Sequence, residues 1–153
     1  MYIFVTERLL NAVESENALA MVLAHEIAHV KNRDPITMVD SSTTFSLMIA
    51  IVFGADADFI ENSISIVSSS FSRAQEERAD KDALFALNNY CGYTFGAEEF
   101  FQKVLKDEKF SINFLSSHPD TQRRIEYILK TQEEGTKIKL TPLSKSISDI
   151  KTK

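Results

Sequence analysis

The sequence predicts a predominantly helical α+β domain with a short β-strand at its amino terminus. Apolar residues recur at helical spacing through most of residues 15–132, and β-favouring residues open the chain from Tyr2 to Thr6. The chain has 153 residues, enough for one domain with a substantial core. We expect this domain to cover residues 1–134. Residues 135–153 are polar and carry no core pattern, which predicts a carboxy-terminal tail.

Capping residues and prolines predict the helix boundaries. Ser15 is suited to cap a helix that runs to about Asn32. This helix should stop before Asp34-Pro35, because proline disfavours helix in the residue before it. Apolar residues at helical spacing predict further helices over residues 60–88 and residues 97–106, and Pro119 should open a last helix in its first turn, over residues 119–132. Ser68 to Ser70 are helix-weak, so a kink or break within residues 60–88 is the alternative there.

An almost uninterrupted apolar run extends from Phe45 to Phe53 and is closed by Gly54. It is well short of the ~20 residues that a helix needs to cross a bilayer. We therefore expect a buried core helix, with a membrane-facing or interfacial segment as the alternative.

Composition excludes one class of partner. The formal net charge is −5, and no stripe of Lys and Arg residues is present. A nucleic acid partner is therefore not expected. The opening residues lack the basic region and the long apolar region of a signal peptide, so we expect no signal peptide within these residues.

The segment His25-Glu26-Ile27-Ala28-His29 carries the clearest chemical pattern. Two histidines four residues apart lie on one face of a helix, so both imidazoles can reach one ion, and Zn²⁺ accepts nitrogen ligands at roughly 2.0–2.1 Å. Glu26 is rotated about 100° from His25, which suits a general base acting on a metal-bound water better than a third ligand. The alternative is a chance pattern on a surface helix, but the flanking residues are apolar.

A third ligand is predicted in the segment from Ser72 to Asp80. Glu76 and Asp80 are one turn apart, so Glu76 could bind zinc while Asp80 accepts the outer N–H of a zinc-bound histidine. The alternative for this segment is a solvated helix face of mixed charge, which we expect for Glu77 and Arg78.

Three blocks of the sequence together resemble metallopeptidase family forty-eight, which contains periplasmic BepA-like, membrane HtpX-like and CAAX prenyl-protease enzymes. They stand in the family's order and at its spacing, and the resemblance covers Tyr2 to about Gln132. The blocks are His25 to His29, Ser72 to Asp80, and His118-Pro119 followed by Arg124.

The resemblance implies a zincin-like core of the gluzincin type that binds one Zn²⁺ per chain. On this resemblance His25, His29 and Glu76 bind the zinc ion. Glu26 activates the water, and Asp80 orients a zinc-bound histidine, for which His25 is the first choice.

Two further residues take their roles from the same resemblance. His118 would stabilise an oxyanion or act as an extra zinc ligand that plugs the open position; its sequence context alone also fits a histidine at a helix amino terminus. Arg124 would be an orienting or substrate-facing partner.

The implied function is a zinc metalloendopeptidase that hydrolyses misfolded or membrane-associated protein substrates. One alternative is a zinc-bound, chaperone-like binding module in which His118 plugs the metal. Another is a fragment of a membrane-embedded CAAX-type protease, which the lack of a spanning segment disfavours. The implied location is the bacterial periplasm or a membrane surface, with a peripheral membrane or outer-membrane-assembly partner.

The start of the chain departs from the family pattern. Family members carry an edge segment before the position of Tyr2 that pairs with substrate backbone, and this sequence begins after it. We therefore expect a catalytic-domain fragment whose exposed strand, Tyr2 to Thr6, promotes self-association through edge-to-edge pairing.

Overall fold

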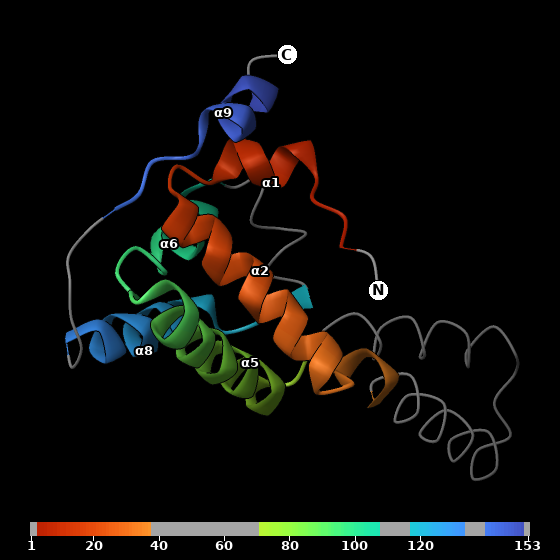
Figure 1. Cartoon of the computed structure of the whole chain (residues 1–153). Coiled ribbons are helices and arrows are strands. Elements are labelled where there is room, and N and C mark those ends of the chain that lie inside the picture. Colours follow the sequence, from red (N-terminus) through yellow and green to blue (C-terminus); the bar gives the residue numbers. More distant parts are fainter. Residues whose placement is uncertain (1–2, 38–70, 108–116, 134–139, 152–153) are drawn as a thin grey trace, which may run out of the picture.

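A computed structural model describes residues 3–37, 71–107, 117–133 and 140–151, and these residues are mostly helical (Figure 1). The helices are α1 (Glu7–Ala12), α2 (Glu16–Lys31), α5 (Arg73–Ala86), α6 (Glu99–Lys106), α8 (Thr121–Glu133) and α9 (Lys145–Lys151), with a π-helical turn, η1 (Leu87–Cys91), directly after α5. Helix α2 packs most extensively on α5, while α6 contacts both α2 and α8. These four helices therefore surround one core.

The core is built mainly from side chains of the same four helices and η1, and Leu10 and Ala12 of α1 extend it. Its fully buried members include Met21 from α2, Leu87 from η1, Phe101 from α6 and Ile128 from α8. Burying each side chain of this size contributes roughly 1.5–3 kcal/mol. The helices that carry the candidate site residues are thus held by a shared apolar interior.

Helix α2 confirms the prediction of a helix from Ser15 to about Asn32. The Ser15 hydroxyl accepts a hydrogen bond from the Ala18 N–H at 3.1 Å and donates one to Glu99 at 2.6 Å. The cap therefore also joins the start of α2 to α6. The helix ends at Lys31, three residues before Asp34-Pro35, as expected from the proline.

Helix α5 begins later than predicted. Ser72 and Gln75 form a capping box, with Ser72 Oγ accepting from the Gln75 N–H and Gln75 Oε1 accepting from the Ser72 N–H. One continuous helix over residues 60–88 is therefore wrong, because residue 72 is a helix start, and this start lies close to the alternative break at Ser68 to Ser70. Residues 60–70 lie outside the described part of the chain. Gly92, with φ of +72°, ends η1.

Pro119 does not open the last helix. Helix α8 starts at Thr121, and the Asp120 carbonyl accepts the early helical hydrogen bond from the Arg124 N–H at 3.1 Å. Asp120 has φ of +58°, so the chain turns between the proline and the helix. His118 consequently lies in a bend before α8.

The predicted amino-terminal strand is not present in the described residues. Residues 3–6 have no regular structure, and no strand occurs among residues 3–37, 71–107, 117–133 or 140–151. A strand requires a partner for its backbone groups, and none of these residues supplies one. The sequence analysis also missed α1, which Thr6 caps by accepting from the Leu9 N–H at 3.2 Å. Self-association through this strand stays a prediction.

Residues 140–151 lie against the body of the fold. Pro142 forms an isolated β-bridge with Ser15, and the Thr141 N–H donates to the buried Asn17 side chain at 3.0 Å. Leu143 and Ile147 pack on the core, and α9 contacts α1 (Figure 1). A domain boundary at residue 134 stays a prediction, but the described part of the tail is helical and docked.

The predicted apolar helix at Phe45–Phe53 lies outside the described residues. Within the described ranges, every helix is too short or too polar to cross a bilayer.

Two glycines with positive φ give a matched test of the fold. A Cβ at Gly96 (φ +81°) would come within 2.5 Å of Leu140 Cδ2 and 3.3 Å of Asn17 Cβ, whereas a Cβ at Gly92 (φ +72°) would meet nothing within 4 Å. We expect Gly92→Ala to lower the free energy of unfolding by about 1–2 kcal/mol through backbone strain alone. Gly96→Ala should lower it further, because the added Cβ also crowds the buried Asn17 Cβ, although the exposed end of Leu140 can move away. Urea unfolding measures both values, and equal losses would contradict the predicted contact.

Candidate metal centre

Four buried side chains from three parts of the chain converge in the core. His25 and His29 lie one turn apart on α2, Glu76 lies in the first turn of α5, and His118 precedes α8. One donor atom from each lies within 4.8 Å of the others. His29 Nε2 is 3.0 Å from His25 Nε2 and 3.2 Å from Glu76 Oε1, and His118 Nδ1 is 3.0 Å from the same Glu76 oxygen.

Carboxylates set the tautomers of the two α2 histidines. Asp80 Oδ1 is 2.9 Å from His25 Nδ1, and Asp34 Oδ2 is 2.8 Å from His29 Nδ1. A carboxylate accepts, so each imidazole donates its Nδ1–H outward, and in its neutral form it directs the Nε2 lone pair inward. Two lone pairs and the Glu76 carboxylate then face one another, an arrangement that a cation between them stabilises.

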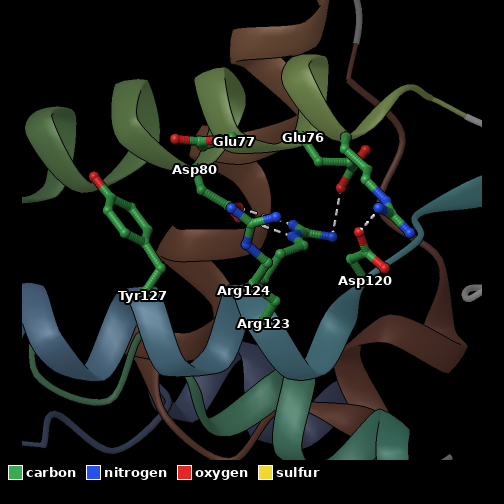
Figure 2. Close-up of a pocket in the computed structure, with 8 residues that line it drawn as sticks. Glu76, Glu77, Asp80, Asp120, Arg123, Arg124 and Tyr127 are labelled. Carbon is green, nitrogen blue, oxygen red and sulfur yellow. Dashed lines mark hydrogen bonds and ion pairs between the residues drawn. The ribbon is translucent and has the colours of Figure 1, made fainter.

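Arg124 holds the acidic side of this group in place. It reaches from α8 to α5, where its Nε and Nη2 each donate to Asp80 at 2.8 Å (Figure 2). Its Nη1 lies 2.5 Å from Glu76 Oε2, and its guanidinium stacks over the Phe101 ring at 4.6 Å. Only 4% of Arg124 is exposed. The side chain thus fixes two carboxylates on neighbouring turns of α5.

The charged states of these groups follow from their partners. Burial acts to raise the pKa of Glu76, but hydrogen bonds from His118 and His29 and the charge of Arg124 outweigh it and lower this pKa. For the same reason Arg124 and His25 lower the pKa of Asp80 against the effect of burial. Both carboxylates are therefore ionised at neutral pH.

The two α2 histidines respond in opposite directions. Burial lowers the pKa of His25, which favours the neutral form that can donate a lone pair. Burial also acts to lower the pKa of His29, but hydrogen bonds to Glu76 and Asp34 outweigh it and raise this pKa. Without a cation, the surroundings of His29 therefore favour the protonated imidazole, whose Nε2–H donates to Glu76; a cation bound between the histidines and Glu76 would replace that proton.

These residues fit a zinc ion. The buried carboxylates of Asp34, Glu76 and Asp80 carry a formal charge of −3, and the buried Arg124 carries +1, so the net charge of these four side chains is −2. The half-exposed Arg78, paired with Asp34, changes this sum to −1, so a divalent cation brings the group close to neutrality in either count. Donor atoms 3.0–3.6 Å apart are close to the separation of about 3.3 Å in a tetrahedral site with ligands at 2.0–2.1 Å.

Glu26 lies on the open side of this group. Its side chain is 48% exposed, and its Oε1 is 3.6 Å from His118 Nε2. Both residues border a cleft of about 480 Å³, which is lined by α1 and the residues before it, by α2, by Phe100 of α6 and by the segment before α8. The cleft is largely apolar, with Ile3, Phe4, Leu9, Val22, Leu23 and Phe100 among its lining residues. A substrate could therefore approach Glu26 and His118 from solvent.

All seven predicted site residues lie in this region, and the sequence analysis overlooked Asp34 and Arg78. Asp34 was considered only as part of the helix stop, although a carboxylate five residues after a candidate ligand histidine is a usable signal. Arg78 was expected to face solvent. Arg78 and Glu77 are both exposed as expected, but Arg78 also pairs with the buried Asp34, whereas Glu77 pairs with Lys81.

This arrangement is typical of a zincin-like protein. Two histidines lie one turn apart on one helix, a glutamate follows the first of them, and a second helix supplies another glutamate beside the pair. Residues 1–132 match Peptidase family M48, so the chain belongs to this family.

Two relatives give the range of the similarity. The chain is 24% identical over 146 residues to the mitochondrial metalloendopeptidase OMA1 of Saccharomyces cerevisiae. The matched region covers 89% of this chain and 42% of that protein. The chain is also 26% identical over 129 residues to a protease HtpX homolog of Salinibacter ruber. In this case the matched region covers 74% of this chain and 46% of that protein. The chain thus spans less than half the length of either relative. No solved structure matches it.

Arg124 pairs with both Glu76 and Asp80, and we call these two contacts the Arg124 clamp. The clamp predicts an effect on stability. Arg124→Met should lower the free energy of unfolding of the metal-free protein by about 3–5 kcal/mol, because Glu76 and Asp80 stay buried without their cation. Arg73→Met is the matched control, since Arg73 also pairs across α5 and α8, with Asp120, but its side chain is 75% exposed. The control should cost no more than about 1 kcal/mol. Chemical denaturation in EDTA measures both, and a small loss for Arg124→Met would contradict the clamp.

Proposed function

We propose that this protein is a zinc-dependent metalloendopeptidase that hydrolyses peptide bonds in protein substrates. The observation that carries the proposal is the meeting of His25 Nε2, His29 Nε2 and the Glu76 carboxylate in a buried group, with Glu26 on its open side. Membership of the peptidase family and relatives named as a metalloendopeptidase and a protease support the same reaction class.

The proposed reaction assigns a task to each residue. His25, His29 and Glu76 hold one Zn²⁺, which when bound lowers the pKa of a water and polarises the scissile carbonyl. Glu26 takes the proton of the attacking water and passes it to the leaving amine. His118 directs Nε2 to the same side as Glu26 and stabilises the developing oxyanion.

Asp80 and Arg124 act as orienting residues in this proposal. The 2.9 Å contact between Asp80 and His25 Nδ1 supports the role of Asp80. For Arg124, burial and its two carboxylate partners favour an orienting role over contact with substrate. The apolar cleft beside Glu26 supports substrates that present large apolar side chains near the scissile bond, such as unfolded proteins.

A second candidate function is a zinc-bound binding module in which His118 plugs the open position. The 3.0 Å contact between His118 Nδ1 and Glu76 favours it, because His118 then belongs to the ligand group. An exposed glutamate at position 26 favours the enzyme, since a binding module needs no base there. A periplasmic or membrane-associated location, a membrane or outer-membrane-assembly partner, and the CAAX-type alternative stay predictions.

The proposed ligand set predicts metal content. The purified protein should hold about one Zn²⁺ per chain. Glu76→Ala should reduce this content sharply because it removes a ligand, whereas Glu77→Ala, on an exposed neighbouring position, should not. Elemental analysis after desalting measures both, and equal zinc content in the two variants would exclude Glu76 as a ligand.

The proposed base predicts a separation of binding from chemistry. Glu26→Gln keeps the shape of the side chain but cannot take a proton, so zinc content should be unchanged while hydrolysis of unfolded casein by the full-length protein falls by about 10²–10⁴-fold. Glu77→Gln serves as the control and should retain activity. Normal turnover by the Glu26→Gln variant would refute the proposed role of Glu26.

A further inference from the structure

We propose that Asp34 is a positioning residue of the candidate metal centre: it orients His29 and links that orientation to the turn of α5 that carries Glu76. This inference rests on the zinc site of the proposed function and adds a residue to it. Asp34 is 1% exposed, so its carboxylate depends on protein partners.

The first step is the contact with His29. Asp34 Oδ2 accepts the Nδ1–H of His29 at 2.8 Å, and both side chains are almost fully buried. The imidazole therefore keeps its proton on Nδ1 and directs Nε2 toward His25 and Glu76. Phe71 stacks on the same ring at 3.8 Å between centroids, so one face of the imidazole is packed while its edge is hydrogen-bonded.

The second step is the backbone that brings Asp34 back to the histidine. Helix α2 ends at Lys31, and the Arg33 N–H donates to the Val30 carbonyl at 3.1 Å. Arg33 has φ of +58°, a conformation that residues other than glycine rarely adopt. The turn at Arg33 redirects the chain, so that Asp34 lies beside His29 although it follows the end of the helix.

The third step is the link to α5. Asp34 Oδ1 accepts from Arg78 Nη2 and, at 3.4 Å, from Gln75 Nε2. The Gln75 amide oxygen meanwhile accepts from the Ser72 N–H in the capping box. Gln75 directly precedes Glu76, so one carboxylate connects a ligand histidine of α2 to the first turn of α5. The two oxygens of Asp34 therefore have different partners: Oδ2 accepts from His29, and Oδ1 accepts from Arg78 and Gln75 of α5.

The experiment measures zinc affinity of the full-length protein by competition with a chelator, at a temperature where circular dichroism shows each variant folded. Asp34→Ala should weaken zinc binding about 10–100-fold. Asp34→Asn keeps an oxygen that can accept from His29 but loses the charge, so it should recover part of this loss. Both variants should also change the visible absorption spectrum of the Co²⁺-substituted protein, which reports the geometry of the ligands.

Asp82→Ala is the matched control. Asp82 accepts from the Asn32 side chain at 3.1 Å and so joins the same end of α2 to α5 without contacting a histidine. Its zinc affinity should stay within about twofold of wild type, because its loss removes a helix contact and no orienting carboxylate.

The outcomes decide the inference in each case. Zinc affinity of Asp34→Ala within about threefold of wild type, or an equal loss in Asp82→Ala, would overturn it. If Asp34→Ala does not fold, Asp34→Asn decides: unchanged affinity together with an unchanged Co²⁺ spectrum would overturn the inference. A wild-type protein that binds no zinc would instead remove the proposed function itself, whereas tight wild-type binding with unaffected Asp34 variants would remove this inference alone.

Discussion

The burial of Arg124 is the constraint on which the candidate site depends. Glu76 and Asp80 are both about 1% exposed and lie one turn apart on α5, so without a cation between α5 and α8 their mutual repulsion and loss of hydration would oppose folding. The guanidinium contacts both carboxylates and stacks on Phe101, which gives charge, hydrogen bonds and packing together. Because Asp80 in turn contacts His25, the position of α8 determines the orientation of a side chain on α2.

This dependence explains why residues distant in the sequence form one unit. The α2 helix supplies a rigid spacing between two imidazoles, and each imidazole is then oriented by a carboxylate from outside that helix. Asp80 comes from α5, and Asp34 comes from the turn after α2. Orientation is thus set by tertiary contacts, whereas spacing is set by helical geometry alone. Glu26 is half-exposed, lies 3.6 Å from His118 Nε2 and faces the cleft, which suits a group that exchanges protons.

The same distinction explains which features the sequence could reveal. Helix α2 was predicted nearly to the residue because Ser15 and Pro35 act locally, and the four-residue histidine spacing depends only on the helical period. The strand at Tyr2–Thr6 was wrongly predicted over its described residues, since β-favouring residues need a partner that composition does not reveal. The docking of Leu143 and Ile147 was missed for a related reason, because a short helix buries too few residues to produce a periodic pattern.

Assembly of the donor group from residues 25 to 118 has a consequence for folding. The pocket that the donors form does not exist until segments more than ninety positions apart have met, so an ion that prefers this geometry binds the native state more tightly than the unfolded chain. Such selective binding adds RT ln(1 + [L]/Kd) to the stability, about 2.7 kcal/mol when the free ion is at a hundred times its dissociation constant. A bound ion would thus hold α2, α5 and the segment before α8 together, and the free energy of unfolding would rise with the concentration of the free ion.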